Sequence, residues 1–277
     1  MALINTNLLA PDVYGDLVRE KVAGRVIVAQ LAKTNTDLKG QPGETINFPS
    51  WQYIGDATDI VLGQSMTTSA LRQTNKPVTI KMIAAPGVVI NDYDNEVALG
   101  NAIDEAAGQQ ALSIARKKDT DLIAAVKAAP LQGSLSLEGN VTFTELVNGL
   151  KFFGDDANSE DVAAIVVHSC YWPDLLEMDA FTNLNNSVVA QNNGIMRNGT
   201  VGSFLGIPVL CSDRLYDATT QKHMIQIIKK GALAVVEKEN PFVEISRDAS
   251  KRQSVIYTSQ FIASAVVDDS GVVCLSH

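Results

Sequence analysis

A helical pattern of unusual length runs through the middle of the sequence. Asn91 and Asp92 offer an N-cap, and Pro130 ends the run. Between them, apolar residues recur at spacings of three, four or eight and trace one helical face: Ile103, Ala107, Ala111, Ile114, Leu122 and Val126. At ~1.5 Å per residue, a helix over residues 92–129 would be more than ~50 Å long. A compact domain of 277 residues does not need such a helix, and we therefore predict a long helical spine.

Two strand-like runs precede this helix and enclose a polar stretch. Residues 43–49 alternate with period two, and residues 78–83 form a second strand-like run after Pro77. Two such strands make a two-stranded ribbon, which is only marginally stable alone in water. Either its own chain or another copy must supply the surface on which the ribbon lies.

The ribbon contains the candidate inter-subunit contacts. Trp51 and Tyr53 share one face of the first strand, where they form either a core stripe or an intermolecular contact. Asp56 and Asp59 in the polar stretch are either solvated carboxylates or partners for a basic patch on a neighbour. The basic candidates in the second half of the ribbon are Arg72, Lys76 and Lys81.

The flanking segments mix short helices and strands. Residues 8–33 read as an arm with one or two short elements, including a helix that starts at Pro11. Helices are predicted over residues 142–153 and 171–178. Strands are predicted over residues 162–167, 204–210, 225–228, 232–236, 242–245, 255–267 and 272–275. Pro208 indicates an edge or a bulge, and the strand at 255–267 has apolar residues on both faces, so we expect both to be covered.

Charge and composition exclude several classes of protein. The net charge is −9, with no basic stripe for nucleic-acid phosphates, and the cluster Arg116–Lys118 reads as a solvated helix face balanced by Asp119 and Asp121. No apolar run approaches the ~18–20 residues that span a bilayer, and the N-terminus shows no secretory signal. The three cysteines are an odd number without paired spacing, which fits reduced thiols in a cytosol.

Residue patterns for catalysis or cofactor binding are weak. The sequence has no Gly-rich phosphate loop, and its three histidines lack metal-ligand spacing. His168 and Cys170 suggest a cysteine nucleophile, but a strand-end histidine beside a buried thiol explains them better. The acidic pairs at 155–156 and 268–269 flank turn residues and read as exposed turns. We therefore predict no catalytic, cofactor-binding or metal-binding residues, and no enzyme.

The order of these elements resembles the major capsid proteins of tailed bacteriophages, which have the Hong Kong 97 fold. Short stretches are similar as well: GETINFP at 43–49 followed by IGDA at 54–57, ARKKDTDL at 115–122, IVVH at 165–168, GTVGSFLGIPV at 199–209 and PFVEISRD at 241–248. Together they extend over nearly the whole chain from about residue 40.

The resemblance implies an α+β fold with named parts. It assigns an N-terminal arm to residues 1–40 and an extended hairpin, the E-loop, to residues 41–86. A P-domain with the spine helix and long strands takes residues 87–130 and 236–277, and a central A-domain takes residues 131–235. Some members cross-link an E-loop lysine to a P-domain asparagine; no asparagine follows Asn240 here, so we expect no such cross-link.

The implied function is that of a shell subunit. Copies would form pentamers and hexamers of an icosahedral shell around phage double-stranded DNA, assembled in the host bacterial cytoplasm, with each E-loop lying over a neighbour. The expected partners are further copies, a scaffolding protein that is separate unless an extension was removed, a portal, and a decoration protein as an option. The alternatives are the shell of an encapsulin-type nanocompartment and, more remotely, a cysteine hydrolase that uses Cys170 and His168.

Overall fold

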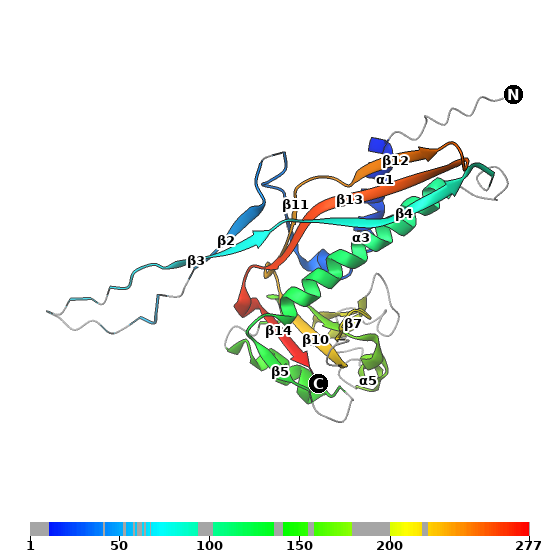
Figure 1. The fold of residues 1–277 in the computed structure, drawn as a ribbon. Helices are drawn as coiled ribbons and strands as arrows, with labels where there is room; N and C mark the ends of the chain where they lie inside the picture. Colours follow the sequence, from blue (N-terminus) through cyan, green and yellow to red (C-terminus); the bar gives the residue numbers. More distant parts are fainter. Residues whose placement is uncertain are drawn as a thin grey trace.

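The computed structural model describes most of the chain, and Figure 1 shows a long sheet, a more rounded body and a projecting hairpin. The described residues are 11–40, 42–51, 54–57, 59, 63, 65–66, 68–93, 102–135, 141–154, 158–178, 200–217 and 221–276. Their strands form a five-stranded sheet, a seven-stranded sheet and a two-stranded ribbon. No helix in this part of the chain combines the length and the apolar character that a membrane crossing requires.

A single 14-residue strand organises the five-stranded sheet. This strand, β13, pairs antiparallel with β4 along one edge and with β12 and then β11 along the other, while β1 runs parallel to β11. The bounds are β1 (Lys33–Asn35), β4 (Lys81–Asn91), β11 (Leu233–Glu237), β12 (Phe242–Asp248) and β13 (Gln253–Val266).

The seven-stranded sheet forms the rounded body in Figure 1. Its order is β5-β14-β10-β6-β8-β7, with β9 paired to β10. On one face lie α4 (Phe143–Lys151), the 3-10 turn η3 (Ser169–Tyr171) and α5 (Trp172–Glu177). The strands are β5 (Gln132–Ser134), β6 (Val162–Val167), β7 (Thr200–Phe204), β8 (Ile207–Cys211), β9 (Tyr216–Asp217), β10 (Lys222–Lys229) and β14 (Val272–Ser276).

The helix α3 (Ala102–Lys127) packs against both sheets and connects their cores. Ala111 and Ile114, in its first half, are buried against the five-stranded sheet and α1 (Pro11–Ala23). Leu122 and Val126, near its end, are buried against the far face of the seven-stranded sheet. The predicted apolar face is therefore confirmed over the described helix, and α3 acts as a spine between the two sheets.

The structure describes the larger, C-terminal part of the helix predicted over residues 92–129. The 26 residues of α3 have a length of about 39 Å. Asn91 ends strand β4, and helical backbone begins directly after it at Asp92 and Tyr93, in agreement with the predicted start; residues 94–101 lie outside the described residues.

Two residues of the predicted solvated face of this helix are buried. Lys118 is 4% exposed and pairs with Glu237 at 2.7 Å. The Asp119 carboxylate accepts hydrogen bonds from the backbone N–H groups of residues 27–29 at 2.8–3.0 Å, which include the start of the 3-10 turn η1 (Ala29–Leu31). The solvated-face interpretation is thus wrong for this pair, because the N-terminal segment returns to cover the helix there. Lys117 and Asp121 remain at the surface as an i,i+4 ion pair.

Most of the other predicted elements are confirmed. Residues 142–153 contain α4, which begins with a capping box between Thr142 and Glu145. The strand over residues 162–167 is β6, and Pro173 lies in the first turn of α5. The predicted C-terminal strands correspond to β10 to β14.

Two predicted strands are wrong in their extent. Residues 78–83 are split between β3 (Gln73–Thr79) and β4, so the ribbon strand starts earlier and contains Pro77. Residues 204–210 form a hairpin rather than one strand, because Leu205 and Gly206 adopt positive φ angles of 51° and 83° and turn the chain between β7 and β8. Pro208 lies on an inner strand, but at a position before pairing with β6 begins, so its missing N–H breaks no ladder there.

Candidate functional site

The ribbon of β2 (Thr45–Trp51) and β3 extends away from both sheets, as Figure 1 shows. The two strands pair antiparallel over seven residues. Three apolar side chains between the end of β2 and the start of β3 are 59–72% exposed: Ile54, Met66 and Leu71. An isolated ribbon with exposed apolar side chains gains little from its own folding, so these residues mark it as a surface for another molecule.

The base of the ribbon is held by its own chain. Lys76 forms an ion pair with Asp269 at 2.5 Å, beside the 3-10 turn η4 (Asp269–Gly271). Lys238 donates to the backbone carbonyl of Gly43 at 2.8 Å, and the backbone of Ile80 donates to Glu44 at the same distance. These contacts fix where the ribbon leaves the body without covering its outer part.

The structure distributes the candidate contact residues along this ribbon. Trp51 pairs with Gln73 at the end of β2, and Tyr53 lies outside the described residues. Three candidates are exposed on the ribbon or just after it: Asp59, Arg72 and Lys81. Asp56 is exposed as well, whereas Lys76 is engaged by Asp269. The expected turn chemistry at 268–269 is present, since the Asp268 carboxylate accepts from the Ser270 backbone and hydroxyl; the pair at 155–156 lies outside the described residues.

One face of the five-stranded sheet carries a second exposed apolar surface. The strand registers place four large side chains on the face opposite α3, and they are 49–62% exposed: Met82, Val89, Phe242 and Tyr257. We call these four residues the outer face. The inner face of β13 is covered, with Ile256 and Ile262 both 1% exposed. The expectation that both faces of this strand are covered is therefore wrong within one chain.

A bulge shapes the centre of the outer face. Pro86 and Gly87 of β4 lie opposite the single residue Tyr257, where the register shifts. A Cβ atom at Gly87 would lie 2.7 Å from Cε1 of the Tyr257 ring, so only glycine lets the ring lie across β4. The tyrosine ring thus lies against β4 at Gly87, although about half of the residue faces solvent.

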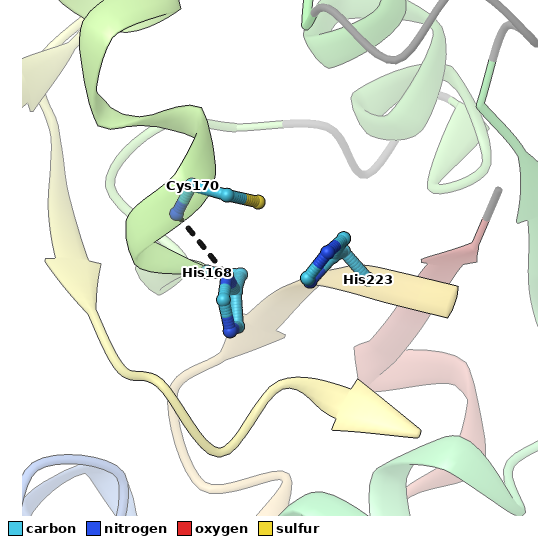
Figure 2. Close-up of side chains that lie close together, drawn as sticks. All are labelled: His168, Cys170 and His223. Atoms are coloured by element: carbon cyan, nitrogen blue, oxygen red, sulfur yellow. Dashed lines mark hydrogen bonds between the residues drawn. The ribbon is translucent and has the colours of Figure 1, made fainter. Parts of the chain in front are cut away.

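The His168–Cys170 pair is not arranged as a nucleophile and its base. His168 Nδ1 accepts a hydrogen bond from the backbone N–H of Cys170 at 3.1 Å, as Figure 2 shows. Cys170 is exposed, so the predicted buried thiol is wrong, but partial burial of the thiol still raises its pKa, and the Asp174 carboxylate raises it further. Burial also lowers the pKa of His168, as does nearby His223. These shifts disfavour the thiolate–imidazolium pair that a cysteine hydrolase needs.

A long sheet, a spine helix, a rounded body and a projecting hairpin together define a shell-building subunit. Residues 77–275 match the family model described as phage capsid protein, and the chain therefore belongs to this family. The chain is also 28% identical over 269 residues to the major capsid protein of Staphylococcus phage phiMR11, covering 97% of this chain and 93% of that protein. It is a phage major capsid protein, and the nanocompartment and hydrolase alternatives are not supported.

Solved structures agree on the fold. The capsid of cyanophage P-SCSP1u aligns with a TM-score of 0.66 at 15% identity, covering 90% of this chain and 87% of that one. The capsid of a native GTA particle gives 0.65 at 12% identity, with coverages of 90% and 89%. Mycobacterium phage Che8 gives 0.63 at 19% identity, with 90% of each chain covered. The predicted α+β fold of the Hong Kong 97 type is confirmed.

Sequence reasoning missed the outer face. The sequence neighbours of its four residues lie on the opposite face and are mostly apolar as well, among them Ile83, Val88, Val243 and Ile256, so no period-two alternation marks these four residues. The registers of β4 and β12 against β13 were needed to show that these residues share one face.

Proposed function

We propose that copies of this chain assemble as pentamers and hexamers into an icosahedral shell around double-stranded DNA, with the ribbon of each copy lying over the outer face of a neighbour. The observation that carries this proposal is the pair of unpartnered apolar surfaces in one chain, on the ribbon and on the five-stranded sheet. Burying each against the other removes both from water without exposing a new apolar surface. The ribbon reaches away from its own outer face, so the occupant is a second copy.

In this proposal the regions have the roles implied by their positions. Residues 131–235 form the A-domain around which capsomers close, with residues 272–276 returning to its sheet. Residues 87–130 and 236–277, apart from this returning strand, provide the P-domain, residues 41–86 the E-loop and residues 1–40 the arm. A separate scaffolding protein, a portal and an optional decoration protein act as partners during assembly in the host cytoplasm.

The acidic charge suits a container for DNA. A net charge of −9 per chain disfavours tight adhesion of the polyanion, which lets the genome be packed and released. A reconstruction with a continuous basic inner surface would contradict this rationale.

Electron microscopy of charged variants tests the contact. Tyr257→Glu on the outer face and Leu71→Glu on the ribbon should each abolish shells and leave smaller soluble species. Both positions are about half exposed or more, so the free energy of unfolding of the subunit should change by only about 0.5 kcal/mol. Val13→Glu, on the exposed side of α1, is the matched control and should still form shells. Normal shells from both charged variants would refute the contact.

The same preparations test for a covalent link between subunits. Boiled shells should run as monomers on denaturing gels, because no asparagine follows Asn240 to accept an E-loop lysine. A ladder of covalent oligomers would contradict this expectation.

A further inference from the structure

Three side chains that are distant in the sequence meet at one corner of the seven-stranded sheet. His168 follows β6, Cys170 lies in η3, and His223 lies near the start of β10. One ring nitrogen of each histidine and the Cys170 Sγ atom all lie within 4.8 Å of one another. Figure 2 shows the three side chains around a common space.

We propose that His168, Cys170 and His223 bind a divalent transition metal ion of the zinc type, with water as the fourth ligand. Imidazole nitrogen and thiolate sulfur are the ligands that Zn²⁺ prefers, and three protein ligands leave the open position of a non-structural zinc site. The site lies within one chain and has no role in the assembly contact proposed above, so either proposal can fail without the other.

The geometry requires only a small contraction. Ligands of tetrahedral zinc at about 2.0–2.3 Å from the ion lie about 3.3–3.6 Å from one another. The present limit of 4.8 Å therefore leaves at most about 1.2–1.5 Å to close, by rotation of side chains. Cys170 is exposed and both histidines are half-buried, so the side chains can rotate and an ion can enter from solvent.

An orphaned polar atom points to a missing ligand. His223 Nδ1 is buried and has no hydrogen-bond partner among the residues that the structure describes, which is unfavourable for a ring nitrogen. Three aromatic rings surround this histidine at centroid distances of 4.3–6.0 Å: His168, Tyr171 and Tyr216. A metal bound at this nitrogen would remove the orphan.

The surroundings supply orientation and charge for the ion. The His168 ring makes a hydrogen bond with the backbone of Asp213, the type of second contact that orients metal-binding histidines. Binding through His168 Nδ1 would replace its present bond from the Cys170 backbone. The thiol proton of Cys170 passes to solvent as the metal–sulfur bond forms. The carboxylates of Asp174 and Asp213 are near enough to interact with Cys170 and would partly balance the charge of the ion.

Metal titration of the full chain tests this proposal. Chelator-treated protein should take up one Zn²⁺ per chain by calorimetry, and Co²⁺ should give a thiolate-to-metal charge-transfer band in the near ultraviolet. Cys170→Ser should remove that band. His223→Gln should weaken Zn²⁺ binding by at least about 10–100-fold, the cost known for weaker second contacts.

Matched controls are available because the chain contains one other histidine and two other cysteines. Ser169→Ala lies between two proposed ligands, and His277→Ala removes the third histidine of the sequence; both should bind as the unaltered chain does. Zn²⁺ should also slow alkylation of Cys170 in the unaltered chain, a readout that needs no variant to fold. The proposal would be overturned if the unaltered chain showed no saturable Zn²⁺ binding, or if Cys170→Ser and His223→Gln bound Zn²⁺ as tightly as the unaltered chain does.

Discussion

Gln110 joins the spine helix to the bulge beneath the outer face. The side chain is 1% exposed, and its oxygen accepts hydrogen bonds from the hydroxyls of Tyr14 and Thr258 at 2.8 and 2.7 Å. Its amide nitrogen donates to the backbone carbonyls of Pro86 and Ile256 at 3.2 and 2.9 Å. One glutamine therefore satisfies groups from α1, β4 and β13 at the position where the β4–β13 ladder is irregular.

Replacing Gln110 by Leu should destabilise the subunit strongly. The leucine keeps most of the volume but leaves two hydroxyls without an acceptor and two carbonyls without a donor. Each orphaned buried group costs about 1–3 kcal/mol. The two hydroxyls set a lower limit of about 2 kcal/mol, and partial relaxation of the carbonyls keeps the total near about 6 kcal/mol or below.

Thermal unfolding of the soluble subunit, followed by circular dichroism, measures this effect. For a chain of this size each kcal/mol lowers Tm by about 2–4 °C, so Gln110→Leu should lower Tm by at least about 4 °C. Gln109→Leu is the matched control on the same helix. Its side chain is exposed and donates a hydrogen bond to Glu105 at i−4, so Tm should shift by no more than about 1–2 °C.

A double variant separates lost hydrogen bonds from poor packing. Removing the orphaned hydroxyl in Tyr14→Phe with Gln110→Leu should cost less than the sum of the two single changes, because the second change removes a group that the first left unpaired. Strict additivity of the two effects, or equal losses for Gln109→Leu and Gln110→Leu, would refute this account of the junction.

Thiol labelling and acid titration give two further outcomes. Iodoacetamide should alkylate Cys170 in the folded chain and spare Cys211 and Cys274, because burial raises the pKa of each of these two to about 11. Mass spectrometry checks this, and labelling of Cys274 before unfolding would contradict it. Asp92→Asn should flatten the acid side of the stability curve. The bidentate Arg247 guanidinium lowers the pKa of Asp92, so its contribution is present above the ordinary carboxyl pKa and lost as pH falls through the lower folded value. Urea unfolding from about pH 6 to about pH 3 measures this, and equal slopes in both proteins would refute it.

The sequence pattern correctly predicted those helices and strands whose signal, an apolar face or a capping residue, lies within the element itself. The buried run of β6, the capping box of α4 and the apolar face of α3 each depend on neighbours within one element. The strand bounds that were predicted wrongly depend on pairing with other parts of the chain. Leu205 carries no turn signal of its own, yet it adopts a positive φ because β7 and β8 pair on each side of it.

The buried charges on the spine helix show the same limit. Lys118 and Asp119 are adjacent charged residues, which a sequence pattern places in solvent. Their partners are Glu237 and the backbone of residues 27–29, about 90 to 119 positions away. The metal-site candidates were separated in the same way, since His168 and His223 come together only through the antiparallel pairing of β6 and β10.

The outer face explains why the prediction that both faces of β13 are covered is wrong for a single chain. Apolar residues on both sides of a strand indicate that both sides are covered in the working state of the protein, but they do not say by which molecule. Within one chain, α3 covers the inner side and nothing among the described residues covers Tyr257. The apolar pattern of β13 suits a strand that is covered on both sides in the proposed shell. A neighbouring copy is therefore expected on the side that one chain leaves exposed. The network around Gln110 fixes β13 on both sides of Tyr257, and Gly87 leaves room for the ring on β4, so less conformational entropy would be lost when a neighbour binds.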